Sequence, residues 1–154
     1  MSRQTKRCIK FGSFVLLILY IAVLIYVCFL SEDYGRDVIT SYYRYNLIPF
    51  KEIRRFYIYR DVVGIRAFLA NLFGNVLAFM PYGFFMPILR PKLRRMNRMF
   101  LAAFLLSLTI EITQLLTRVG SFDVDDLILN TSGGIIGYLL FYIINKVRRK
   151  WNGA

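Results

Sequence analysis

The chain has 154 residues, which is room for a single domain, and 57% of them are hydrophobic. A soluble domain of this size cannot bury so much apolar surface, and the apolar residues form long blocks, so a membrane protein is predicted. The net charge of +12 comes from basic residues that cluster at the ends of those blocks. Without a zinc motif or a basic-aromatic sheet, nucleic acid is not an expected partner.

The first apolar block, residues 11–30, follows a basic segment at 1–10 and contains no charged residue. About 20 apolar residues let a helix cross the hydrocarbon core of a bilayer. A cleaved signal peptide is the alternative, because the start is basic. However, the block is longer than a typical signal core, and no A-x-A-like cleavage site follows. We therefore expect a retained transmembrane helix.

The segment from 31 to 67 is rich in tyrosine and arginine, with apolar residues between them. Disordered segments contain fewer aromatic residues, whereas these residue types are favoured at the level of lipid headgroups. We predict that this segment lies along the extracytoplasmic interface of the membrane. Its pattern leaves open whether it is helical.

Three further apolar blocks are long enough to span a bilayer. The block at 68–89 contains Pro81 and Pro87, which membrane helices tolerate where neighbours satisfy the freed carbonyl groups. The rest of the chain divides into a cytoplasmic link at 90–98, a span at 99–119, an acidic turn at 120–126, a span at 127–145 and a basic tail at 146–154. The sequence thus predicts an all-α membrane protein with four transmembrane helices and an interfacial segment between the first two.

The flanking charges predict the orientation. Lys and Arg number four in residues 1–10, five in 90–98 and four in 146–154, and no acidic residue lies among them. The other side, counted with the outer ends of the spans, has eight basic and all nine acidic residues. Because basic flanks stay in the cytoplasm, we expect a multi-pass plasma-membrane protein with both termini in the cytoplasm.

Polar residues from three spans fall at a similar depth, toward the extracytoplasmic side, at ~1.5 Å of rise per residue. On the third span, Ser107 begins a stripe with helical spacing. Asn71 lies one turn from another asparagine on the second span, and Asp125 is one of three aspartates at the start of the fourth. The predicted ligand-binding cluster consists of Asn75, Glu111, Gln114, Arg118, Asp123, Asp126 and Asn130.

Each of these features has a structural alternative. Glu111 could be a protonated carboxyl bonded to a neighbouring helix, and Arg118 could extend to the interface without a partner. Asp123 and Asp126 could cap a helix. The asparagines could hydrogen-bond between helices. Close helix packing is also the simplest interpretation of three glycines in the fourth span, Gly133, Gly134 and Gly137.

The residue types narrow the chemistry. The chain has no histidine, and neither cysteine is placed in the cluster, since Cys8 is in the basic start and Cys28 near the end of the first span. Carboxylate and amide oxygens could hold Mg²⁺ or Ca²⁺, but the sequence does not show a metal, and no cofactor is predicted. The carboxylates could also do acid-base work, but no nucleophile is visible beside them. Recognition of a polar or charged ligand needs the fewest assumptions.

Four stretches of the chain resemble the signature of VanZ-like membrane proteins: "NLIPF" (46–50), "NLFGNVLAFMPYGFFMP" (71–87), "EITQ" (111–114) and "FDVDDLILNTSGGIIGY" (122–138). The resemblance places a VanZ-like domain at about 46–145. By motif it assigns family positions to Asn75, Pro81, Gly83, Glu111, Gln114, Asp123, Asp126, Asn130, Gly134 and Gly137. Many relatives place an arginine closer to the aspartates than Arg118 is here.

The resemblance implies a small multi-span domain connected with resistance to teicoplanin-type glycopeptide antibiotics. Two classes of function stay open. In the first, a non-enzymatic envelope protein binds a glycopeptide, a lipid-linked cell-wall precursor or another partner at the polar cluster. In the second, an intramembrane enzyme or cation-dependent carrier acts on a lipid-linked headgroup. We favour the first, because glycopeptides act outside the cytoplasmic membrane.

Overall fold

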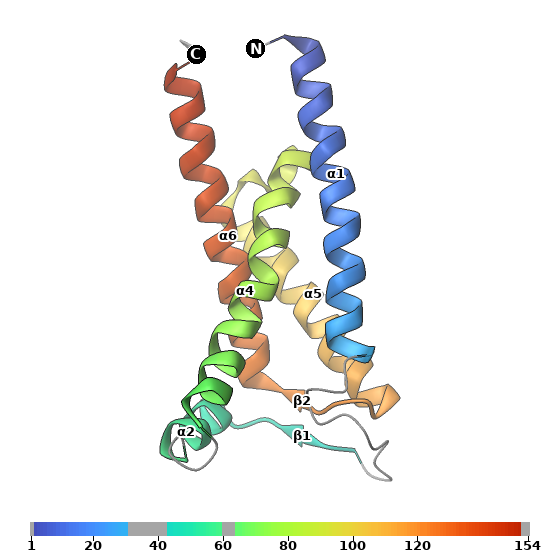
Figure 1. Ribbon diagram of the computed structural model, residues 1–154, viewed down its shortest axis with the longest axis vertical. Helices are drawn as coiled ribbons and strands as arrows, with labels where there is room; N and C mark the ends of the chain where they lie inside the picture. The colour runs from blue at the N-terminus through green and yellow to red at the C-terminus, as the bar shows by residue number, and fades with distance from the viewer. Residues whose placement is uncertain (1, 31–42, 60–63, 152–154) are drawn as a thin grey trace.

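The computed structural model describes residues 2–30, 43–59 and 64–151, except the side chains of 67, 68 and 71. Within these ranges, four helices are long and apolar enough to cross a membrane (Figure 1). They are α1 (Arg3–Ile25), which continues as a π-helical turn at Tyr26–Leu30, α4 (Ile65–Leu89), α5 (Met96–Thr117) and α6 (Val124–Trp151). The predicted all-α fold with four membrane-spanning helices is confirmed.

The helices extend beyond the apolar blocks that predicted them. α1 includes most of the basic start, and α6 continues through the basic tail as far as Trp151. Lys and Arg are good helix formers, so a charged flank leaves the membrane without ending the helix. α4 stays helical through both of its prolines and ends at Leu89, before the 3₁₀ turn Pro91–Arg94.

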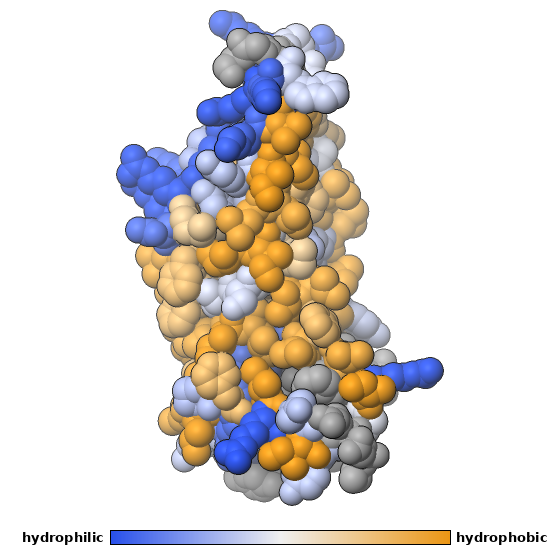
Figure 2. Space-filling view, turned by 90° about the vertical axis from the view of Figure 1, so that its left-hand side faces the viewer, coloured by the Kyte–Doolittle hydropathy of each residue, from blue (hydrophilic) through white to orange (hydrophobic). Residues whose placement is uncertain are grey.

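Helix α6 is the centre of the bundle. It packs along α4 and against α5, and α1 contacts mainly α4 (Figure 1). Met99 and Ala103 of α5 are buried against Tyr138 and Phe141 of α6. The middle of the surface is hydrophobic, and hydrophilic residues gather at the end that carries the termini (Figure 2). We call this the termini end.

Glycines let α6 and α4 approach closely. A Cβ added at Gly133 or Gly137 would overlap a backbone carbonyl of α4, and one added at Gly83 would overlap the carbonyl oxygen of Gly134. On another side of α6, a Cβ at Gly134 would lie 2.6 Å from that of Ala103. Lipid offers no hydrophobic force between helices, so such close packing is what holds them together.

The opposite end of the bundle carries the short elements (Figure 1). α2 (Lys51–Ile58) lies there, together with two parallel strands, β1 (Tyr45–Asn46) and β2 (Phe122–Asp123). Their register pairs Asn46 with Asp123, which joins positions 77 residues apart in the chain. We call this the strand end. Of the interfacial segment predicted at 31–67, residues 31–42 and 60–63 lie outside the described ranges.

The glycine contacts give the first prediction. Gly137→Ala should lower the free energy of unfolding by about 1–3 kcal/mol, because the added methyl group must push α6 away from the Met80 carbonyl. Gly12→Ala in α1 is the control, since its Cβ would meet nothing within 4 Å. The free energy of unfolding of that variant should equal that of the wild type or exceed it by up to about 1 kcal/mol, because Ala is the better helix former. Thermal unfolding in detergent measures both, and equal effects would contradict the close contact.

Candidate functional site

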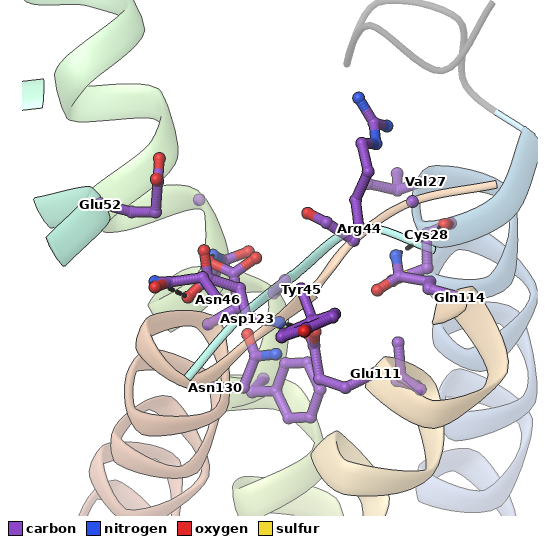
Figure 3. Close-up of a pocket in the computed structure, with 18 of the residues that line it drawn as sticks. Val27, Cys28, Arg44, Tyr45, Asn46, Glu52, Glu111, Gln114, Asp123 and Asn130 are labelled. Atoms are coloured by element: carbon purple, nitrogen blue, oxygen red, sulfur yellow. Dashed lines mark hydrogen bonds between the residues drawn. The ribbon is translucent and has the colours of Figure 1, made fainter. Parts of the chain in front are cut away.

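A cavity of about 480 Å³ lies at the strand end, between the π-helical turn of α1, β1, α2, α4, α5 and the start of α6 (Figure 3). Its charged and amide lining residues are Arg44, Asn46, Lys51, Glu52, Arg55, Asn75, Glu111, Gln114, Asp123, Asp126 and Asn130. Six of the seven residues of the predicted ligand-binding cluster therefore line one cavity. We call it the polar cavity.

Helix α5 contributes a buried polar stripe to this cavity. Glu111 is only 2% exposed, and its Oε2 accepts a hydrogen bond of 2.8 Å from the backbone N–H of Asp123. One turn further, Gln114 Nε2 donates to the backbone oxygen of Cys28 at 3.0 Å. The stripe thus connects α5 with the start of α6 on one side and with the end of α1 on the other (Figure 3).

The carboxylate of Asp123 organises the strand pair. Its Oδ1 accepts hydrogen bonds from Asn46 Nδ2 at 3.0 Å and from the backbone N–H of Asp125 at 2.8 Å. Asn46 Oδ1 in turn accepts from the backbone N–H of Ile48 at 3.2 Å. An aspartate predicted as a ligand or a cap is therefore the junction between the "NLIPF" stretch and α6.

Asp125, which is 1% exposed, caps a different helix from its own. Its two carboxylate oxygens accept the backbone N–H groups of Phe50, Glu52 (2.8 Å) and Ile53 (3.2 Å) at the start of α2. Phe50 occupies the N-cap position of α2 with a left-handed φ of 63° and offers no capping side chain. A carboxylate from α6 satisfies these donors instead and complements the positive end of the α2 dipole.

Asn130 of α6 and Asn75 of α4 complete the polar lining. Asn75 Nδ2 donates to Asp126 Oδ1 at 2.5 Å, and Asn130 Nδ2 donates to Ser107 Oγ at 3.0 Å. Asn130 is 4% exposed, and its Oδ1 has no hydrogen-bond partner among the described residues. A buried acceptor without a donor is costly, so an unpartnered oxygen at a cavity wall is a candidate contact for a ligand or an ordered water.

Arg118, the seventh residue of the predicted cluster, does not line the cavity. It ends α5 with a left-handed φ of 59°, and its guanidinium lies 4.7 Å from the ring centroid of Tyr43. This is a cation–π contact at the edge of the bundle. The side chain of Asn71, which the sequence placed near Asn75, lies outside the described residues.

The predicted cluster lacks five charged or amide residues that line the cavity: Arg44, Asn46, Lys51, Glu52 and Arg55. Only the "NLIPF" stretch hinted at one of them, Asn46. Asp125, which the sequence placed among the three aspartates, does not line the cavity and instead bonds the start of α2. The prediction that neither cysteine falls near the cluster is wrong for Cys28, which lines the cavity beside Gln114 (Figure 3). The π-helical turn at Tyr26–Leu30 carries it there, and a straight apolar block gives no sign of such a turn.

Charges of both signs surround the cavity. Burial raises the pKa of the Asp123 carboxyl, and the nearby charges of Asp125 and Glu52 also raise it, against hydrogen bonds from Asp125 N–H and Asn46 that lower it. Glu52 forms an ion pair of 2.7 Å with Arg55. Arg44 extends away from the carboxylates, and its buried Nε has no partner among the described residues (Figure 3).

No group of three Asp, Glu, Cys or His side chains within the described ranges is arranged to hold a metal ion. The carboxylates instead accept hydrogen bonds from backbone and amide N–H groups, as Asp123 and Asp126 illustrate. The divalent cation that the sequence left open stays a hypothesis. The chemistry that these contacts support is recognition of a ligand with both donors and acceptors.

Comparison with known proteins decides the family. A sequence model of the VanZ/LLP1 family matches residues 17–145, which is most of the chain. The chain belongs to the VanZ family. Protein VanZ of Enterococcus faecium is 29% identical over 133 residues, which cover 85% of this chain and 74% of that protein. No solved structure matches the chain.

The stretches that resemble VanZ-like signatures are scattered along the chain but meet at the polar cavity. The stretches around Asn46, Asn75, Glu111 and Asp123 all resemble VanZ-like signatures, and in this chain all four residues line the polar cavity. Gly133 and Gly137, which follow in the same stretch as Asp123, pack α6 on α4. The VanZ-like motifs therefore build one cavity and the helix contact beneath it.

Asp125 gives the second prediction. Asp125→Ala should lower the free energy of unfolding by about 2 kcal/mol, because it leaves the start of α2 uncapped. Asp125→Asn should lower the free energy of unfolding by less, since the amide oxygen of asparagine can still accept a backbone N–H group at the start of α2. Protease cleavage within 43–59, measured on protein in detergent, should follow the order alanine, asparagine, wild type. An alanine variant cleaved no faster than wild type would show that α2 is held in another way.

The raised pKa of Asp123 gives the third prediction. The Asp123 carboxyl contributes most to the free energy of unfolding below its unfolded pKa of about 3.9, where it is protonated in both states. That contribution is lost as the pH rises through the higher pKa of the folded state. Asp123→Asn keeps an acceptor for Asn46 and Asp125 but does not titrate. The stability difference between wild type and this variant should therefore shift in favour of the variant as the pH rises through that window. A constant difference from pH 4 to pH 7 in thermal unfolding would contradict it.

Proposed function

We propose that this VanZ-family membrane protein contributes to tolerance of teicoplanin-type glycopeptide antibiotics by binding the polar part of a ligand in the polar cavity. The observation that carries the proposal is the buried Oδ1 of Asn130, which lines the cavity without a hydrogen-bond partner among the described residues. What distinguishes Asn130 from the other buried α6 side-chain group without a partner among the described residues is its place on the cavity wall, where a ligand or an ordered water can supply the missing donor. The antibiotic connection comes from family membership.

The mixed charges around the cavity favour a ligand with groups of both signs. Glu52, Glu111 and Asp126 contribute carboxylates, while Lys51 and Arg55 contribute cations. A purely cationic or purely anionic ligand would meet like charges on part of this lining. Amino-sugar and peptide portions of cell-wall components carry ammonium, amide and carboxylate groups together, and so do glycopeptides.

The size of the cavity narrows the ligand further. About 480 Å³ is within the range of pockets that hold drug-sized molecules. A whole glycopeptide antibiotic is much larger, so the cavity would take one portion of it or the headgroup of a lipid-linked cell-wall precursor. The predicted orientation, with the basic termini in the cytoplasm, turns the strand end toward the outside of the cell, where both ligands occur.

The fourth prediction tests binding at Asn130. Asn130→Leu should weaken binding of the polar ligand about 3- to 10-fold, because one hydrogen bond to the cavity wall is lost. Thr131→Val is the matched control. Thr131 is the next residue, its buried hydroxyl also has no hydrogen-bond partner among the described residues, and it does not line the cavity. Cells that express equal membrane amounts of each protein should lose teicoplanin tolerance with the leucine variant and keep it with the valine variant.

Purified protein separates the ligands and the functional classes. Teicoplanin and a lipid-linked peptidoglycan precursor are titrated in parallel against wild type, Asn130→Leu and Glu111→Gln. Conversion of the precursor, abolished by Cys28→Ser, would favour an intramembrane enzyme, because Cys28 is the one cysteine at the cavity within the described residues. Unchanged tolerance and unchanged binding in both cavity variants would overturn the proposal.

A further inference from the structure

A second hollow, of about 840 Å³, lies at the termini end between α1 and α6. Its floor and walls include four apolar side chains, Phe84, Ile88, Phe141 and Ile144. Its basic side chains come from both ends of the chain and from the 3₁₀ turn, and they are Lys6, Lys10, Arg94, Arg148 and Arg149. We call this hollow the basic groove.

Among the described residues, no acidic side chain lines the basic groove. The nine acidic residues of the chain all fall within positions 32–61 and 111–126, and the described ones lie toward the strand end. Partial burial lowers the pKa of the Arg94 guanidinium, and the positive charges of Arg149 and Arg148 lower it further. Cations that repel one another across a groove favour an anion between them.

Arg94 is held in place for such a contact. Its Nε donates to the backbone oxygen of Pro87 at 3.0 Å, a carbonyl near the end of α4 whose usual helical donor would be the N–H that Pro91 lacks. Its guanidinium lies 5.9 Å from the ring centroid of Phe141, and its backbone oxygen accepts from Tyr138 Oη at 2.8 Å. The bond to Pro87 uses Nε and not the Nη pair, which can contact a phosphate in bidentate fashion.

From this arrangement we propose that the basic groove binds an anionic glycerophospholipid. The phosphate sits among Arg94, Arg148 and the lysines of α1, and an acyl chain lies against Phe84 and Ile144. Basic side chains that only extend to the membrane interface need no apolar wall beside them. Here a rim of cations and an apolar floor occur in one hollow, which matches a headgroup above its own hydrocarbon chains. This site is separate from the polar cavity at the strand end.

The fifth prediction compares two double variants of the same helix. Arg148→Gln with Arg149→Gln should weaken phosphatidylglycerol binding by about 30-fold, because each cation near an anionic lipid contributes about 5-fold. Lys146→Gln with Lys150→Gln is the control: it removes equal charge from the same turns, and neither residue lines the groove. The control variant should bind phosphatidylglycerol no more than about 5-fold more weakly than the wild type. Full-length protein in detergent is titrated with the lipid, and bound lipid is counted by native mass spectrometry.

Two further ligands identify what is bound. Phosphatidylcholine tests for acyl chains without net negative charge, and inorganic phosphate tests for the anion without chains. We expect phosphatidylglycerol alone to bind in a one-to-one complex and to raise the melting temperature. Equal binding of phosphatidylcholine, full competition by inorganic phosphate at similar concentration, or equal losses in the two double variants would each overturn the proposal. Melting in phosphatidylcholine confirms that both variants are folded.

Discussion

The structure of the strand end depends on one buried carboxylate. Asp125 stands in the first turn of α6 and accepts the N–H groups at the start of α2, so the two helices begin at a shared point. The free N–H groups of a helix start are costly to bury, and Phe50 cannot cap them. Asp125 thus anchors the start of α2, the helix that forms the cavity wall with Lys51, Glu52 and Arg55.

The same use of carboxylates recurs around the cavity. Glu111 accepts the N–H of Asp123, and Asp126 accepts the amide of Asn75, so neutral donors take part in holding both acids. A neutral donor fixes a carboxylate in place without cancelling its charge. The lining thus combines these acids with the basic side chains of Lys51 and Arg55, and Glu52 forms an ion pair of 2.7 Å with Arg55. A site that retains both signs in this way suits a ligand that carries both.

The sequence predicted the helices and much of the site, because both follow from local patterns. Charge-free blocks predict the spans, and the spacing of Ser107, Glu111 and Gln114 predicts a stripe whose members are buried together. Glu52 and Asp125 meet across 73 residues, and no periodicity encodes such a contact. The left-handed turn at Arg118 and the π-helical turn before residue 31 likewise redirect side chains, which is why Arg118 leaves the cavity and Cys28 joins it.

The two ends of the molecule use polar groups in opposite ways. At the strand end, acids and amides are mostly bonded within the chain, and Asn130 Oδ1 is the buried amide atom without a partner among the described residues that the proposed ligand would contact. At the termini end, cations such as Arg94 and Arg149 lie near one another, and no acidic side chain among the described residues lines their groove, which favours a counter-charge from a bound anion. Anionic lipids on that side would hold α1 and α6 at a fixed depth. Because α6 also carries Asp125, Asp126 and Asn130, a fixed depth for α6 fixes the depth of the polar cavity as well.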